Sequence, residues 1–263
     1  MVTRTSHQDL LEPLRLLIAC FAEMIGTMMI VLFCCGSLTG EEPMDLIRVS
    51  LTFTFTVTTM IAITADVSGG HINPAVTIAM LVARRISVFR CLTYIVFQCV
   101  GGIAGAVLLR AIVGEDNANS LGATMVDSKL TYSQGFGIEF IITFILIMTV
   151  FAITDPARND NLGSGPLHVG IAIGMGHLLA VPYTGAGMNP ARSLGPAVAM
   201  DIWTAHWIYW TGPIGGAILA ALLYEHLFAA NATLRKTKAW CMSRQYDNDN
   251  FEKALSKFDS TKL

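Results

Sequence analysis

The chain has 263 residues, of which 53% are hydrophobic and only 14% charged, and its mean hydropathy is +0.56. An average soluble domain carries about 25% charged residues, so this composition excludes an ordinary soluble protein and is typical of a membrane protein. The formal net charge of −2 argues against bulk electrostatic attraction to nucleic acid.

Six apolar segments are long enough to cross a bilayer, which takes about 20 predominantly apolar residues. In chain order they cover 16–37, 46–65, 91–112, 136–154, 166–182 and 206–228. The fifth is short unless it tilts or ends irregularly. The sequence therefore predicts an all-α membrane protein. Its channel domain covers 16–228, in two repeats of about 16–112 and 136–228, between an N-terminal tail (1–15) and a C-terminal tail (229–263).

Two shorter apolar pieces, about 74–83 and 190–199, cannot cross a bilayer. Each begins in an Asn-Pro-Ala triplet, Asn73-Pro74-Ala75 or Asn189-Pro190-Ala191, and each triplet follows a Gly-rich turn. Proline at the first helical position, after a polar residue, indicates a helix N-terminus. Non-helical backbone at membrane depth is tolerated only where it is buried in protein or lines a watery cavity. We therefore expect two re-entrant half-helices that enter from opposite sides.

The two halves of the chain repeat at a fixed offset. Asn73 and Asn189 are 189 − 73 = 116 residues apart, and Glu23 and Glu139 are 139 − 23 = 116 apart. Each half carries Glu-x-x-x-Thr in its first span and Asn-Pro-Ala 50 residues after the Glu. Three spans per half reverse the orientation of the second half, which predicts an inverted repeat of the kind found in membrane transport proteins.

Glu23 and Glu139 are the only acidic residues deep within the predicted spans. A carboxylate at the bilayer centre costs about 2.5–3.5 kcal/mol on insertion scales, so each is expected to face the bundle interior and to have partners. One interpretation is a proton relay. The other is that each carboxylate accepts hydrogen bonds from backbone N–H groups of the neighbouring re-entrant loop. The repeat symmetry favours the second, because a relay needs different groups along a path.

The distribution of Lys and Arg predicts the orientation. With six spans both termini lie on one side of the membrane, together with the 66–90 connection and the 155–165 loop. These segments hold 13 of the 17 Lys and Arg residues. The positive-inside rule then places both termini in the cytoplasm. We expect an integral protein of the plasma membrane.

The residues around both triplets, SGGHINPAVT over 68–77 and YTGAGMNPARS over 183–193, resemble the two signatures of the aquaporin (major intrinsic protein) family. The resemblance extends over about 16–228. It implies a homotetramer with one pore per subunit, in which the half-helices meet at the midplane and Asn73 and Asn189 point into the pore. An Asn NH₂ group can donate to a passing water oxygen, and the positive ends of both half-helix dipoles face the same point. This arrangement orients water and opposes the passage of protons and cations.

The resemblance also implies a selectivity filter toward the extracellular side, formed by Phe53, His177, Ala186 and Arg192. Phe53 and His177 narrow the opening, and Arg192 supplies fixed positive charge and donors. Taken singly, Phe53 is better explained as core packing and His177 as an interhelical hydrogen-bonding group. Together with Arg192 and the loop signature, the filter is favoured. Ala186 stands where many water channels have Cys, which predicts a slightly wider filter and weak inhibition by mercurials at this position.

Two further features have open interpretations. His71 is expected to line the cytoplasmic vestibule, either as a pH sensor or, as we favour, as a hydrogen-bonding group. The stretch 235–244, with Lys236, Lys238 and Trp240, is either a site for calmodulin or anionic lipid or, as we favour, a positively charged flank of the membrane. The acidic end after Tyr246 is expected to be a flexible tail.

These features predict a passive, water-selective channel for osmoregulation, with single-file water permeation and exclusion of protons and ions. The sequence shows no metal-ligand cluster, nucleotide-binding loop or nucleophile–base pair, so we expect no enzyme activity, no catalytic residue, no metal and no cofactor. Water and membrane lipids are the expected partners.

Three alternatives stay open. One is a channel that also passes glycerol or other small neutral solutes, which only the Ala186 opening supports. Against it, Ser193 stands where glycerol-conducting relatives typically carry Asp. The others are an alternating-access transporter, which would show saturation and ion coupling, and a structural protein of cell adhesion.

Overall fold

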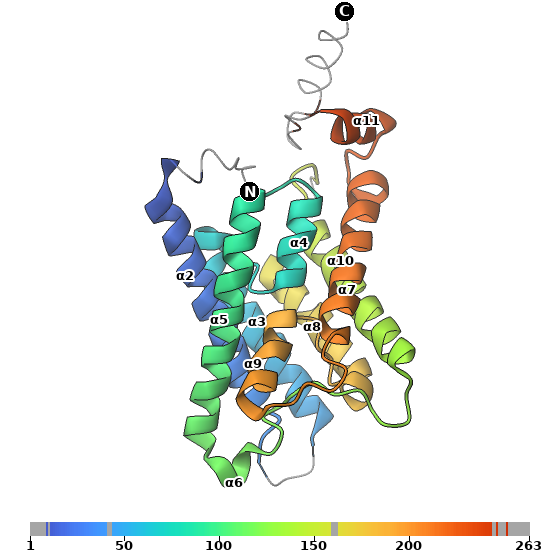
Figure 1. The fold of residues 1–263 in the computed structure, drawn as a ribbon. Coiled ribbons are helices and arrows are strands. Elements are labelled where there is room, and N and C mark those ends of the chain that lie inside the picture. Colours follow the sequence, from blue (N-terminus) through green and yellow to red (C-terminus); the bar gives the residue numbers. More distant parts are fainter. Residues whose placement is uncertain are drawn as a thin grey trace, which may run out of the picture.

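The computed structural model describes residues 9, 11–40, 44–158, 163–243, 246 and 251 of the chain. This described part is a bundle of helices without a strand (Figure 1). Five of its helices are long and apolar enough to cross a membrane. They are α2 (Pro13–Ile30, continued by the π-helix η1, Val31–Cys35), α3 (Leu46–Ser68), α5 (Val88–Val113), α7 (Tyr132–Ile153) and α8 (Gly165–Thr184).

The sixth predicted span is α10 (Ile208–Leu223), which has 16 residues and continues as the π-helix η2 (Tyr224–Phe228). The π-helical turn interrupts the regular helix, but the two pieces together cover 208–228, close to the predicted limits. The fifth span, expected to be short, extends from 165 to 184 and has 20 residues, enough to cross. The prediction of an all-α membrane fold with six long segments is confirmed.

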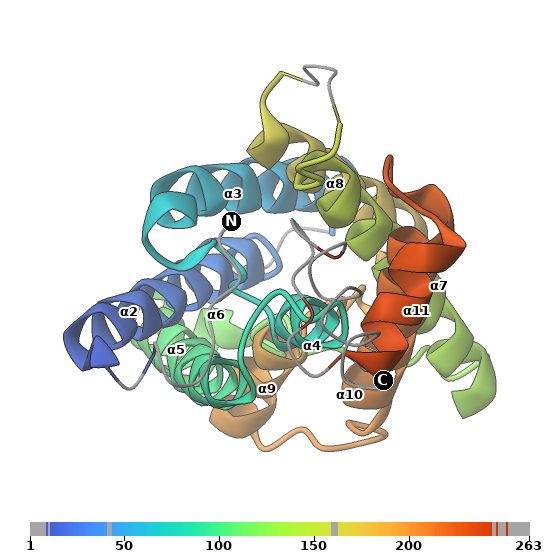
Figure 2. The same ribbon diagram turned by 90° about the horizontal axis from the view of Figure 1, so that it is seen from above.

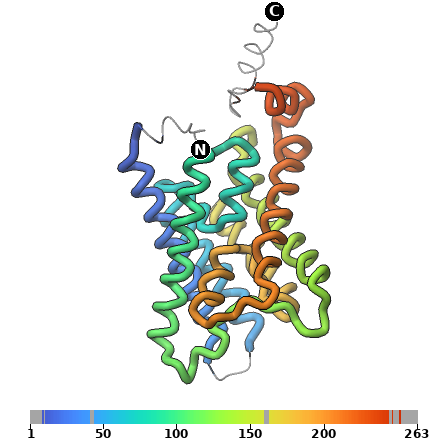
Figure 3. The backbone as a smooth tube through the Cα atoms, in the orientation of Figure 1, coloured from blue at the N-terminus to red at the C-terminus, as the bar shows by residue number. Residues whose placement is uncertain are grey.

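The two short apolar pieces form the half-helices α4 (Pro74–Val82) and α9 (Pro190–Met200). They enter the bundle from opposite ends, and their N-termini point toward each other near its middle (Figures 1 and 3). Seen from above, α4 lies inside the group of long helices (Figure 2). The largest buried apolar cluster of the described part includes residues of α3, α4, α7, α8 and α10, so the half-helix α4 is packed into the core.

Glycine allows α9 to pack directly on the backbone of α5. A Cβ atom on Gly102 would lie 2.3 Å from the carbonyl oxygen of Ala191, and one on Gly195 would lie 2.3 Å from the carbonyl oxygen of Gly102. Real Cβ atoms do not approach backbone oxygens so closely. The position of the half-helix therefore depends on the absence of side chains at these two contacts.

Besides the half-helices, two short helices of the described part lie outside the predicted spans. One is α6 (Glu115–Ala118), and the other is α11 (Leu234–Met242), which falls in the segment predicted to be a C-terminal tail. The side chain of Thr233 caps α11 by accepting a hydrogen bond from the backbone N–H of Lys236. The rest of the acidic tail, apart from 246 and 251, lies outside the described residues.

Candidate functional site: a pore between two half-helices

Asn73 and Asn189 cap the two half-helices. The Oδ1 atom of Asn73 accepts from the backbone N–H of Ala75 at 2.8 Å, and that of Asn189 accepts from Ala191 at 3.0 Å and from Arg192 at 3.2 Å. In both helices proline follows at the first position, where no backbone N–H is needed. Capping fixes the oxygen of each amide toward its own helix, so the NH₂ group points away from it.

Each NH₂ group reaches the loop of the opposite repeat. Asn73 Nδ2 donates to the carbonyl oxygen of Met188 at 2.9 Å, and Asn189 Nδ2 donates to that of Ile72 at 2.9 Å. The structure thus brings the two triplets together in the interior, although they are 116 residues apart in sequence. An amide NH₂ carries two hydrogens, so one on each Asn remains available to another acceptor.

The loops before the triplets contain left-handed backbone at residues other than glycine. The φ angles are 44° at Ile72, 50° at Ala186 and 52° at Met188. For a β-branched residue such as Ile this region is a genuine outlier, and left-handed backbone costs roughly 1–2 kcal/mol per residue. Such conformations persist only where the surroundings hold them in place.

Two buried carboxylates hold these loops. Glu23 accepts from the backbone N–H groups of His71 and Ile72, from the hydroxyl of Ser68 and from Nε2 of Gln98. Because four donors converge on it, the first strained loop is pinned to α2 and α5.

Glu139 plays the corresponding part in the second repeat. It accepts from the backbone N–H groups of Gly187 at 2.8 Å and Met188 at 2.9 Å, and from the hydroxyl of Thr184 at 2.6 Å. Both glutamates are completely buried and face the re-entrant loops.

Sequence reasoning did not predict that two tyrosines and a glutamine take part in the same networks. The hydroxyl of Tyr94 donates to the carbonyl of Ser68, and that of Tyr209 donates to the carbonyl of Thr184, both at 2.8 Å. The tyrosines are 209 − 94 = 115 residues apart, close to the repeat offset, which is the signal that could have found them. Gln98 has no such signal, because the second repeat has a proline in the corresponding region.

One cavity of about 80 Å³ passes both asparagines, with room for several water molecules. One part of its wall is polar and comes from the two loops, Asn73, Asn189 and His71. The other part is apolar and comes from side chains of α3, α7 and α8: Val57, Ile61, Leu146, Val150, Val169 and Ile173. The apolar part of the wall offers water no hydrogen bonds, so water in this cavity depends on the few polar groups that line it.

Three of the four predicted filter residues line this cavity: Phe53, His177 and Arg192. The rings of Phe53 and His177 are in contact, with centroids 3.6 Å apart, and the guanidinium carbon of Arg192 lies 5.3 Å from the Phe53 centroid. The passage is therefore narrow here. Ala186 is fully buried but is not among the residues that line the cavity.

The polar atoms of this constriction have defined roles. Arg192 Nη1 donates to the carbonyl of Gly122 at 2.7 Å, while its Nε and Nη2 atoms are buried without a partner among the described residues. His177 Nδ1 lies 2.8 Å from the carbonyl oxygen of Ile173. Because a carbonyl only accepts, Nδ1 carries the hydrogen, and Nε2 of the neutral ring is an acceptor. The site thus offers both donors and an acceptor to a small polar molecule.

His71 lines the cavity close to the first triplet. Its Nδ1 atom lies 3.2 Å from the hydroxyl of Thr77, which itself donates to the carbonyl of Asn73. Thr77 is therefore the acceptor for Nδ1–H, and Nε2 of the neutral ring, which has no partner within the described ranges, is an acceptor as well.

The basic stretch 235–244 differs from its sequence interpretation at one residue. Lys236 is buried, and its ammonium group is paired with Glu225. Its charge is thus unavailable to calmodulin or to lipid, and a site for either stays a prediction that rests on the other residues of the stretch.

Comparison with known proteins identifies the family. Residues 11–224 match the sequence model of the family described as Major intrinsic protein, which covers most of the chain. The chain belongs to the major intrinsic protein family.

The curated relatives of this family member include Aquaporin-4 of Mus musculus and of Homo sapiens. Each is 45% identical over 221 residues, which cover 82% of this chain and 68% of the relative. Aquaporin-1 of Homo sapiens is 39% identical over 244 residues, covering 88% of this chain and 91% of the relative.

Among solved structures, the X-ray structure of the aquaglyceroporin from Plasmodium falciparum has a TM-score of 0.74 at 20% identity. The match covers 81% of this chain and 97% of that one. At this identity the likeness shows the fold alone.

Proposed function

We propose that this family member is a passive water-selective channel. The observation that carries the proposal is the crossed pair Asn73 and Asn189, because each amide is fixed by its own helix and by the opposite loop and keeps one N–H for the cavity. Curated relatives named Aquaporin-4 and Aquaporin-1, at 45% and 39% identity, support the same function.

Water passes the asparagines in single file. Its oxygen accepts from the free N–H of each Asn, at the point that the N-termini of α4 and α9 both face. A molecule held by its oxygen there cannot also accept a proton from its neighbour, so a proton does not pass along the file. The positive ends of the two helix dipoles oppose cations at the same point.

The filter selects for size and polarity. Phe53 and His177 leave little room for a carbon chain, and the unpaired donors of Arg192 replace hydrogen bonds that water loses on entry. Ala186 is the only feature that supports passage of glycerol or other small neutral solutes. The burial of Ala186 away from the cavity weakens that alternative.

The strained loops need Glu23 and Glu139 as supports rather than as proton carriers. Each carboxylate accepts hydrogen bonds from the backbone N–H groups of one re-entrant loop, and the two occupy equivalent positions in the internal repeat. We assign both glutamates this structural role.

The protein spans the plasma membrane as a homotetramer, with both termini cytoplasmic. Large apolar side chains are exposed on the outer faces of the long helices, as at Leu17, Phe55, Val96 and Leu179, where lipid or a neighbouring subunit covers them. The functional partners are water and membrane lipid, and the protein catalyses no covalent reaction.

Stopped-flow light scattering on vesicles that contain the purified protein tests the proposal. We expect fast shrinkage in sucrose, slow re-swelling in glycerol and no proton leak. Rapid glycerol entry would favour the broader channel, and saturable flux coupled to an ion would favour a transporter. Flux no greater than that of empty vesicles would refute the channel and favour a structural protein.

A further inference from the structure

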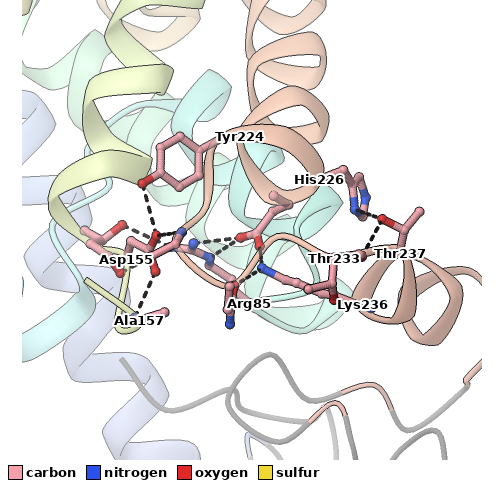
Figure 4. Close-up of polar contacts among 12 residues, drawn as sticks. Arg85, Asp155, Ala157, Tyr224, His226, Thr233, Lys236 and Thr237 are labelled. Atoms are coloured by element: carbon pink, nitrogen blue, oxygen red, sulfur yellow. Dashed lines mark hydrogen bonds and ion pairs between the residues drawn. The ribbon is translucent and has the colours of Figure 1, made fainter. Parts of the chain in front are cut away.

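Helix α11 lies beyond residue 224, where the family match ends, and buried charges attach it to the channel (Figure 4). Lys236 Nζ donates to Glu225 Oε2 at 2.7 Å and to Asn231 Oδ1 at 2.8 Å. The side chains of Lys236 and Glu225 are only 1% and 2% exposed. The other oxygen of Glu225 accepts from Arg85 Nε at 2.8 Å. One carboxylate is thus shared between α11 and the turn that follows the half-helix α4.

Arg84, in the same turn, holds the other end of α11. Its Nη1 atom donates to the carbonyl oxygens of Trp240 at 2.8 Å and Ser243 at 2.7 Å, at the end of the helix where carbonyls lack helical partners. The φ angle of Arg84 is 59°, in the left-handed region that usually takes glycine after a helix. Such backbone persists only where the surroundings hold it in place, and the two hydrogen bonds to α11 help to hold Arg84 there.

Arg85 also connects α11 to the wall of the pore. Its Nη1 atom donates to the hydroxyl of Thr154 at 3.0 Å, and Thr154 and Ile153 line the cavity, whereas Arg85 itself does not. The guanidinium carbon of Arg85 lies 4.4 Å from the ring centre of Phe151. A cation is therefore held directly behind the residues that line the cytoplasmic end of the pore.

The strength of the Arg85–Glu225 pair depends on its burial. Charges in a dry environment attract strongly, whereas an exposed pair is screened by water and adds little. Lys236 occupies one oxygen of Glu225, and α11 keeps the group out of water. Departure of α11 would hydrate the carboxylate and weaken its hold on Arg85.

We propose that α11 is a latch on the cytoplasmic mouth. When docked, it keeps Arg85 paired with Glu225 and clear of the lumen. When undocked, it lets Arg85 turn into the mouth beside Thr154, where a bulky cation lowers water flux. This inference rests on the proposed water channel and adds a means of regulating it.

The test compares Lys236→Met with Lys238→Met in the full chain, reconstituted in vesicles. Met keeps the length of the side chain and removes the charge, and Lys238 is an exposed residue of the same helix. For Lys236→Met we expect hydrogen exchange of the amides in 234–242 to become at least tenfold faster and water permeability to fall at least twofold. Lys238→Met should change neither.

Two further variants separate docking from blocking. Arg84→Gly removes the bonds to the α11 carbonyls and suits the left-handed backbone, so it should undock α11 without harming the turn. If Lys236→Met does not fold, Arg84→Gly replaces it, and we expect the same faster exchange in 234–242 and the same fall in water permeability. Adding Arg85→Met to Lys236→Met should restore the water permeability while the fast exchange persists, because the blocking cation is gone.

Each result decides a different point. Unchanged exchange in both Lys236→Met and Arg84→Gly would overturn the latch. Fast exchange with normal flux, or failure of Arg85→Met to restore flux, would overturn the control of the mouth. Wild-type protein without water flux would instead refute the channel itself, while the exchange data would still report docking.

Discussion

Arg192 shows how a single buried side chain can serve both structure and selectivity. It is 1% exposed, yet Nη1 is the one side-chain nitrogen that is hydrogen-bonded within the described part of the chain, to the carbonyl of Gly122. That bond holds the guanidinium in place, and the remaining N–H groups and the charge face the narrow part of the cavity beside Phe53. Removing the side chain should therefore change what passes rather than whether water passes.

We predict that Arg192→Val leaves water permeability substantial but raises the passage of glycerol or protons at least tenfold. Each tenfold change in rate corresponds to about 1.4 kcal/mol of barrier, a modest share of what a fixed charge contributes in a narrow site. Vesicle swelling and a pH-sensitive dye measure the two leaks. Arg110→Val, at a partly exposed site outside the cavity, is the matched control. Equal selectivity in the two variants would remove Arg192 from the filter.

At the scale of elements, the two re-entrant loops are held against their own strain. The strain of the left-handed backbone at Ile72 and Met188 is offset by the hydrogen bonds that these residues donate to Glu23 and Glu139. The repeats are unequal, because Gln98 adds a fourth donor to Glu23 alone. The second loop, with fewer donors on its carboxylate, is the easier one to disturb.

Replacing Glu139 with Gln tests this support. A Gln side chain has one acceptor oxygen in place of two, so at least one buried loop N–H loses its partner. We expect the free energy of unfolding to fall by about 1–3 kcal/mol. Glu115→Gln, at an exposed carboxylate, is the control and should stay within about 0.5 kcal/mol. Thermal unfolding in detergent measures the stability of both variants. An equal loss of stability in the two would argue against a supporting role of Glu139.

The contact of α9 with α5 gives a second test at this scale. Gly102→Ala places a methyl group against the Ala191 carbonyl, which would have to move, whereas a Cβ on Gly137 in α7 meets nothing within 4 Å. We expect Gly102→Ala to destabilise by about 1–3 kcal/mol and to reduce water flux, because α9 carries Asn189. Gly137→Ala should be neutral or stabilising by up to about 1 kcal/mol. A tolerated Gly102→Ala would show that α9 can shift without cost.

At the scale of the whole molecule, the strongest sequence signals were those that repeat. The apolar spans recur as three in each half, and the two triplets and the paired glutamates recur at a 116-residue offset, so the fold and the central contacts could be predicted. The contacts at the cytoplasmic end could not. Arg85 and Glu225 are 140 residues apart and belong to no repeat, and Lys236 looked like a solvated charge. Only the packed structure shows that these charges are buried together.

At the same end of the molecule, we expect the contacts of Asp155 to weaken at acidic pH. Burial would raise the pKa of this carboxyl, but hydrogen bonds from the backbone N–H groups of Ala230 and Ala157 outweigh it, so the pKa lies below its ordinary value of 3.8. A group whose pKa is lowered on folding adds stability above its ordinary pKa, and that stability disappears as pH falls through the folded value.

We therefore expect wild-type protein to lose thermal stability below about pH 4 more steeply than Asp155→Asn. At neutral pH the variant should be less stable by about 1–3 kcal/mol, since the loop N–H groups lose a charged acceptor. Unfolding temperatures of both proteins between pH 3 and pH 7 measure the difference. Parallel curves would show that the carboxylate charge adds nothing at this site.

The crossed bonds of the two asparagines have one more consequence. A polypeptide with only one repeat would lack the opposite loop. The NH₂ group of its Asn would then have no carbonyl to donate to, and its own loop carbonyl would receive no hydrogen bond. Such a polypeptide could complete a passage only by joining a second copy inserted upside down. Because both orientations are joined in one polypeptide, the two repeats pair in every molecule. Each repeat can also have its own sequence, as Gln98 in the first repeat shows.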